Sequence, residues 1–229
     1  MVCPVTEQFL ASCFVQGLRR DLGSLTTGGP ALLATEVVAR QGIADAVLGK
    51  GSMSVLGEPG VAKTLDSYTN AKVLSLLNGA PRSIRYLSRK SRLPGWRVSR
   101  TLEALEKAHL VERDSSRLDG FVLSDVLRFH QLELWAFEFK LALSERALFQ
   151  ALQYRTFAHR VAIVIPSYLR SLQAARMSHL KALGVGLLTV DLEECVVARV
   201  LNGRSARPYS RFHHIYAVGR FLGTATLIR

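Results

Sequence analysis

Apolar residues recur along this chain with two different periods, and the change from one to the other predicts its elements. A period near 3.6 residues predicts amphipathic helices, whereas short apolar runs between Gly, Pro or polar clusters predict strands. Residues 6–22 follow the helical period, and residues 31–40 and 43–49 form two strand-like runs, the second centred on Asp45. The N-terminal part therefore predicts a helix followed by two strands.

The last hundred residues alternate between the same two patterns. They predict strands at 132–141, 160–166, 185–191 and 194–203, and helices at 144–158 and 167–184. A basic helix is expected in 204–221, where it could touch DNA or a second subunit. Together with the N-terminal elements, this order is typical of an α/β fold, in which helices pack on a sheet.

A different pattern interrupts the α/β order at residues 68–125. Three short helical runs, at 68–79, 82–93 and 96–110, precede an apparent two-stranded hairpin around the polar turn SSRLDG. Three helices followed by a hairpin predict a winged helix-turn-helix domain, whose third helix enters the major groove of DNA.

The charge of the chain is concentrated in this interruption. The formal net charge is +12, and residues 67–102 contain eight Lys or Arg residues and no Asp or Glu. Such a basic segment indicates a nucleic-acid partner, although winged helices also serve as protein-interaction modules. The residues expected to contact bases or phosphates are Arg97, Ser99, Arg100 and Thr101 on the third helix, Arg82, Arg85, Arg89 and Lys90 before it, and Arg117 in the wing.

The segment GEPGVAKT at 57–64 nearly matches a phosphate-binding loop. Ala62 stands where the last glycine of that loop is required, and the helices of the basic domain follow instead of a parallel sheet. Residues 57–67 are therefore interpreted as a linker, with nucleotide hydrolysis as a minor alternative.

The residues around the interruption resemble those of the PD-(D/E)XK nuclease superfamily, which has a restriction-endonuclease-like fold. The resemblance rests on Asp45 in GIADAVLG, on Glu138 and Lys140 in FEFKL, and on Gln150 and Tyr154 in the helix before RVAIVIP. Ala44 replaces the proline that names the motif. The resemblance covers roughly residues 1–50 and 130–200, so the winged helix would be an insertion between two parts of the nuclease-like domain.

The resemblance implies metal-dependent cleavage of DNA phosphodiester bonds. Asp45 and Glu138 would bind Mg²⁺ or Mn²⁺, since carboxylates are hard oxygen ligands. Lys140, two residues after Glu138 and on the same strand face, would position or deprotonate the attacking water and stabilise negative charge. Gln150 would orient the lysine, a water or the substrate, and Glu7 would add a ligand or cover the site. Glu36 on the first strand is a further candidate acid.

These expectations define two domains and one main function. Residues 1–56 and 126–229 are expected to form a mixed sheet flanked by helices, and residues 68–125 the inserted DNA-binding domain. The expected protein is a cytoplasmic, Mg²⁺-dependent DNA endonuclease without a membrane partner, and a homodimer is a further expectation because many such nucleases pair to cut both strands. The alternative is a catalytically inactive DNA-binding regulator or assembly factor on a nuclease-like scaffold.

Overall fold

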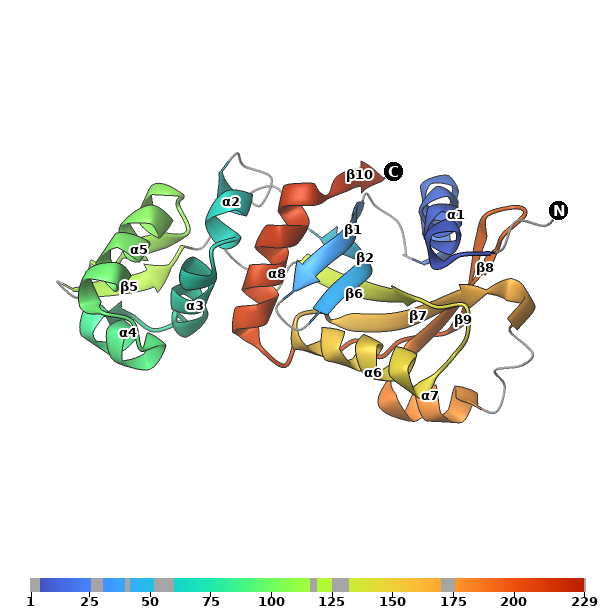
Figure 1. Cartoon of the computed structure of the whole chain (residues 1–229). Coiled ribbons are helices and arrows are strands. Elements are labelled where there is room, and N and C mark those ends of the chain that lie inside the picture. The colour runs from blue at the N-terminus through green and yellow to red at the C-terminus, as the bar shows by residue number, and fades with distance from the viewer. Residues whose placement is uncertain are drawn as a thin grey trace. The chain divides into compact units, whose positions relative to one another are not determined.

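A computed structural model describes residues 5–25, 31–39, 42–51, 60–115, 119–124, 132–169 and 176–228. The chain forms two compact units, which are treated separately here (Figure 1). The first unit consists of Met1–Gly51, Glu133–Tyr209 and Thr224–Arg229, and the second of Ser52–Leu132 and Ser210–Gly223.

A seven-stranded mixed sheet forms the first unit. Its strands, in spatial order, are β10 (Thr226–Ile228), β1 (Ala31–Ala39), β2 (Gly42–Gly51), β6 (Leu132–Phe139), β7 (Arg160–Pro166), β8 (Gly186–Asp191) and β9 (Val196–Leu201). β6, β7 and β8 run parallel to one another, whereas β10, β1 and β2 pair antiparallel, as do β8 and β9. The expected α/β class and the six predicted strands are confirmed, and the short edge strand β10 was not predicted.

Helices pack on both faces of this sheet (Figure 1). Helix α1 (Glu7–Arg20) begins at Thr6, whose hydroxyl accepts a hydrogen bond from the amide of Phe9, and it places Phe14 about 5 Å from the rings of Phe137 and Phe139. Helix α6 (Glu145–Gln153) packs on β7, and α7 (Met177–Leu183) on β8. Because side chains alternate along a strand, Glu138 points away from the face that α1 covers.

The helix predicted at 167–184 is described only in part. Ser167–Leu169 form a short 3-10 turn and α7 occupies its second half, while residues 170–175 lie outside the described part of the chain. Among the helices that the structure describes, none has the length and apolar character needed to span a bilayer.

The second unit contains the three predicted helices and the hairpin. These are α3 (Tyr68–Leu76), α4 (Ile84–Ser91), α5 (Gly95–Lys107), β4 (Val111–Arg113) and β5 (Gly120–Leu123), with a two-residue strand β3 (Arg82–Ser83) pairing with β5. The linker prediction for residues 57–67 was wrong in one respect: Val61–Leu65 form helix α2, whose ends at Val61 and Leu65 are buried. Residues 57–59 lie outside the described part of the chain.

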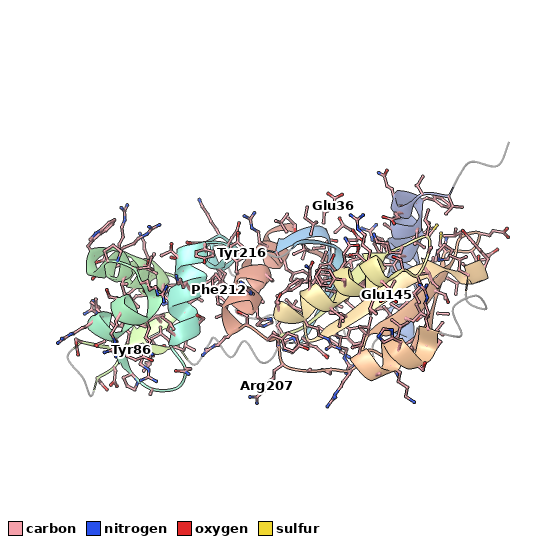
Figure 2. The ribbon with its side chains drawn as sticks, turned by 60° about the horizontal axis from the view of Figure 1, so that its bottom comes forward. Glu36, Tyr86, Glu145, Arg207, Phe212 and Tyr216 are labelled. Carbon is pink, nitrogen blue, oxygen red and sulfur yellow. The ribbon has the colours of Figure 1, made fainter. Side chains whose placement is uncertain are left out.

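Helix α8 (Arg211–Thr224) belongs to the second unit, although the sequence analysis placed it in the α/β domain. The ring of Phe212 lies 4.7 Å from that of Tyr68, and Arg220 forms a 2.5 Å ion pair with Asp66. Phe212 and Tyr216 project from the same helix (Figure 2). These aromatic and charged contacts over a long sequence separation explain why a boundary drawn from sequence order missed the assignment.

The close approach of α8 and α2 gives a test of this boundary. A Cβ atom on Gly219 would lie 2.4 Å from the backbone of Leu65 and Asp66, whereas one on Gly223 in the same helix would meet nothing within 4 Å. We expect Gly219→Ala to lower the free energy of unfolding of the second unit by about 1–3 kcal/mol through overpacking. Gly223→Ala is expected to be neutral or slightly stabilising, and thermal unfolding of the two variants measures the difference. Equal melting temperatures of the two variants would contradict the close packing of α8 against α2.

Candidate active site

The residues predicted to form a catalytic centre come together at the end of β6. Glu138 lies in β6, Lys140 follows that strand, and Glu7 begins α1. The Nζ atom of Lys140 lies 3.0 Å from Oε1 of Glu138 and 3.3 Å from Oε2 of Glu7. Two segments separated by more than a hundred residues thus supply one ion-pair network.

Asp45 joins this centre from the neighbouring strand β2. Its Oδ2 accepts a hydrogen bond of 2.7 Å from the backbone amide of Phe139, so a side chain links β2 and β6 at this point. Burial, together with the charges of Glu138 and Glu7, raises the pKa of Asp45 to about 6, although the Phe139 amide and Lys140 oppose the shift. The carboxylate therefore carries its charge at a cost, which a bound cation would relieve.

Tyr154 holds Glu138 from the opposite side. Glu138 is 1% exposed, and its Oε2 accepts a short hydrogen bond from the hydroxyl of Tyr154, which also lies 2.7 Å from the carbonyl oxygen of Ile43. Burial and the adjacent Glu138 raise the pKa of Tyr154, so the phenol keeps its proton. Tyr154, which the sequence placed only as part of a helix motif, is thus a positioning residue for Glu138.

Gln150, one turn before Tyr154 on α6, is not joined to the centre. Its Oε1 is buried and has no hydrogen-bond partner among the residues that the structure describes. The expected role of Gln150 in orienting Lys140 therefore has no support in the observed contacts.

Lys140 is held as a cation. Burial alone would lower its pKa, but the ion pairs with Glu138 and Glu7 outweigh burial and raise it. A protonated ammonium cannot accept a proton from water, so the arrangement favours charge stabilisation over the general-base role that the sequence analysis allowed.

Glu36 faces this centre from β1 and has an unusual backbone. The strand register pairs Thr35 with Ala46 and Val37 with Ala44, and Glu36 lies between these two pairs and lines the same groove as Asp45. Its φ angle is 53°, in the left-handed region that a non-glycine residue rarely occupies within a strand. Glu36 is exposed, as its labelled side chain shows (Figure 2). Strained residues of this kind concentrate at functional sites, and no sequence pattern indicates them.

The donor set is compatible with a hard divalent cation. No group of three or more His, Cys, Asp or Glu side chains suited to a metal occurs in the described ranges. Mg²⁺ needs fewer protein ligands, since it is usually held by one or two carboxylates together with waters and substrate phosphates. Asp45 and Glu138 are the two carboxylates of the centre that could serve in this way, although the oxygens of Glu138 already pair with Lys140 and Tyr154.

The cations predicted to contact DNA lie mostly on the surface of the second unit. Arg85, Arg89, Lys90, Arg97 and Arg100 are exposed, and Trp96, which the sequence analysis did not select, is 69% exposed at the start of α5.

Four other predicted contact residues differ from these. The guanidinium of Arg82 is half-buried against the ring of Tyr86, 4.6 Å away, and Ser99 is half-buried. Thr101 was predicted wrongly: it is 6% exposed, because it shares the inward face of α5 with Val98 and Leu102. Arg117 lies outside the described residues.

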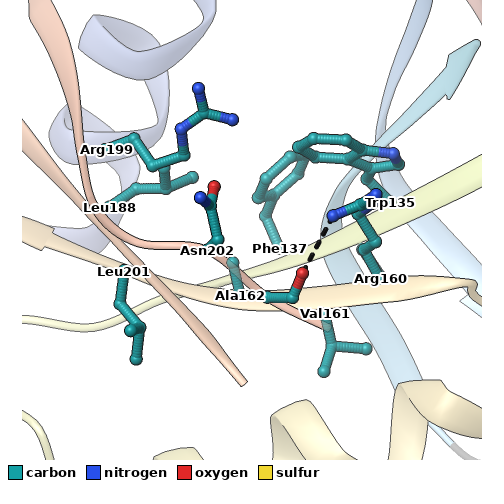
Figure 3. A pocket seen from close by; sticks show the side chains of 11 residues that line it. Trp135, Phe137, Arg160, Val161, Ala162, Leu188, Arg199, Leu201 and Asn202 are labelled. Carbon is teal, nitrogen blue, oxygen red and sulfur yellow. Dashed lines mark hydrogen bonds between the residues drawn. The ribbon is translucent and has the colours of Figure 1, made fainter. Parts of the chain in front are cut away.

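A hollow beside Trp135 in the first unit is structural in character (Figure 3). Its cavity volume is about 10 Å³, enough for about one water molecule. Arg160 fills its edge, with its guanidinium 4.9 Å from the Trp135 ring, an ion pair of 2.7 Å to Glu133 and a hydrogen bond of 2.9 Å to the carbonyl of Gly203. These contacts join β6, β7 and the segment after β9.

Comparison of the chain with protein-family models, curated proteins and solved structures yields no match.

The raised pKa of Asp45 predicts a stability effect that is independent of catalysis. An acid whose folded pKa lies above its unfolded value destabilises the fold once pH exceeds the folded value, so the penalty is absent below about pH 4 and complete above about pH 6. Asp45→Asn keeps the acceptor for Phe139 and removes the charge. We expect it to raise the melting temperature by about 2–4 °C at pH 8, corresponding to about 1 kcal/mol, and by much less at pH 4. A lower melting temperature at pH 8 would contradict the assignment.

Proposed function

We propose that this chain is a metal-dependent DNA endonuclease with a restriction-endonuclease-like catalytic unit and a winged-helix DNA-binding unit. The observation that carries the proposal is the junction at the end of β6, where Asp45, Glu138, Lys140 and Glu7 meet although they come from three separate segments. In an ordinary surface ion pair both charged side chains are exposed. Here Glu138 is buried and is paired with both Lys140 and Tyr154.

Each residue of the centre has a distinct role in this proposal. Asp45 and Glu138 hold the cation, which would act as a Lewis acid on the phosphate and lower the pKa of a bound water. Lys140, kept protonated by its two ion pairs, stabilises the negative charge that develops on the phosphoryl oxygens. Tyr154 fixes the orientation of Glu138, and Glu7 positions Lys140.

The second unit supplies binding. Its elements follow the order helix, strand, helix, helix, strand, strand from α3 to β5, which is consistent with the winged helix that the sequence predicted. Arg97 and Arg100 are exposed near the start of α5, which is the helix expected to enter the major groove. Residues on the other side of that helix, including Thr101, pack inside the unit.

Cleavage assays with plasmid and single-stranded DNA test the proposed chemistry. We expect wild-type protein to cut DNA with Mg²⁺ or Mn²⁺ and not with EDTA. Asp45→Asn and Lys140→Ala should each reduce the cleavage rate by at least about 100-fold, because the first removes a charged ligand of the proposed cation and the second removes the ammonium that stabilises the reacting phosphate. Lys181→Ala, which removes an exposed lysine from α7 of the same unit, is the matched control and should cut normally.

The variant Asp45→Asn also separates lost chemistry from lost folding. It is expected to be at least as stable as wild type at pH 8 while losing activity. DNA binding without cleavage by wild-type protein under any divalent metal would contradict the endonuclease proposal and favour a DNA-binding regulator.

A second measurement tests the DNA-binding surface. The double variant Arg97→Ala/Arg100→Ala should weaken duplex binding and reduce the slope of log K against log salt by about 1.8, since each phosphate contact contributes about 0.9. Lys107→Ala, at the far end of the same helix, should change the slope little. Equal effects of the two changes in a titration at several salt concentrations would contradict the assignment of α5.

A further inference from the structure

A groove of about 800 Å³ runs along α1 in the first unit and reaches Glu7 and Asp45 of the candidate centre. Glu7 and Asp45 line it near the N-terminal end of α1, and Arg19 lines it near the C-terminal end. Its other wall includes Thr35 and Glu36 of β1.

The groove-lining face of α1 carries a row of polar side chains, together with Ala11 and Val15. Gln8, Ser12, Gln16 and Arg19 are spaced four, four and three residues apart, which places them on one face of the helix. All four are exposed, whereas Leu10, Cys13 and Phe14 on another face are buried in the core. The core packing described for the first unit therefore does not involve these four side chains, of which Ser12 donates a hydrogen bond to the carbonyl of Gln8.

The chemistry of this face suits a phosphodiester backbone. Arg, Ser and Gln side chains are among the usual donors to phosphate and sugar oxygens of nucleic acids. The twelve steps from Glu7 to Arg19 span about 18 Å, because a helix rises 1.5 Å per residue. That distance corresponds to about five nucleotides at the 3.4 Å spacing of a B-form strand, and fewer in an extended strand.

The size of the groove limits what can occupy it. Its volume lies within the range of about 300–1,000 Å³ that is usual for pockets binding small molecules. A duplex, whose major groove alone is about 12 Å wide, needs far more room than a single strand. We infer that one single strand of nucleic acid lies along α1, with the phosphate to be cut at Asp45 and a phosphate further along the strand held by Arg19. This inference rests on the proposed nuclease function and adds the substrate class to it.

Arg19 and its neighbour Arg20 provide a matched pair of variants. Both lie in the last turn of α1 and are exposed, but Arg19 lines the groove, whereas Arg20 donates a hydrogen bond of 2.9 Å to the carbonyl of Glu194. Arg19→Gln and Arg20→Gln change the net charge equally and at the same helix end. Both are made in an Arg97→Ala/Arg100→Ala background, so that the cations of α5 contribute little to binding.

The test measures binding of a fluorescent oligothymidylate of about ten nucleotides by anisotropy, without metal and at several salt concentrations. Arg19→Gln should weaken binding roughly tenfold, since the loss of a charged hydrogen bond costs about 1.5 kcal/mol or more. It should also reduce the salt slope by about 0.7, the contribution of one phosphate of a single strand. Arg20→Gln should leave both quantities near those of the background protein.

Equal effects of Arg19→Gln and Arg20→Gln on affinity and on the salt slope would overturn the inference. The proposed nuclease function fails separately, if no DNA is cut with Mg²⁺ or Mn²⁺ by the wild-type protein. A selective effect of Arg19→Gln on binding in a protein that does not cut would leave the strand path standing and remove only the chemistry.

Discussion

The buried carboxylate of Glu138 imposes the central constraint on the first unit. A charge that is 1% exposed must be paired, because the desolvation of an isolated carboxylate costs several kcal/mol. Lys140 supplies the pairing cation, and the hydroxyl of Tyr154 supplies a neutral donor on the other oxygen. Removing Lys140 would leave the charge without compensation in the sheet, and removing Tyr154 would leave one carboxylate oxygen without a donor. The ends of β6 and α6 are thus fixed relative to each other by one side chain.

Asp45 extends this constraint to β2. Its carboxylate bonds the Phe139 amide, and Tyr154 approaches the carbonyl of Ile43, so two polar contacts join β2 to the elements around Glu138. Two carboxylates and a cation share a small volume, and the raised pKa of Asp45 shows that its charge is not fully compensated. An incompletely compensated negative charge beside an open groove is the physical basis of the metal proposal.

The sequence predicted the elements better than it predicted the boundaries between the two units. Periodicity identified six of the seven strands, and the spacing of Glu138 and Lys140 correctly placed both on one side of a strand. Three features depend on long-range packing and were missed: strand β10, the assignment of α8 to the second unit, and the inward position of Thr101. Thr101 was predicted to be exposed because it is polar. The apolar period of Val98 and Leu102 defines the inward face of α5 with or without Thr101, so the pattern did not indicate that Thr101 shares this face.

Glu36 was named from sequence only as a candidate acid, and its backbone conformation gives it a more specific significance. A left-handed residue costs roughly 1–2 kcal/mol, and this one lies between the Thr35–Ala46 and Val37–Ala44 pairs that join β1 to β2. A glycine at this position would remove the cost. The side chain of Glu36 lines the same groove as Asp45 and the polar row of α1. In the proposed function the strain belongs to the site, where the position of a carboxylate matters more than the local stability of β1.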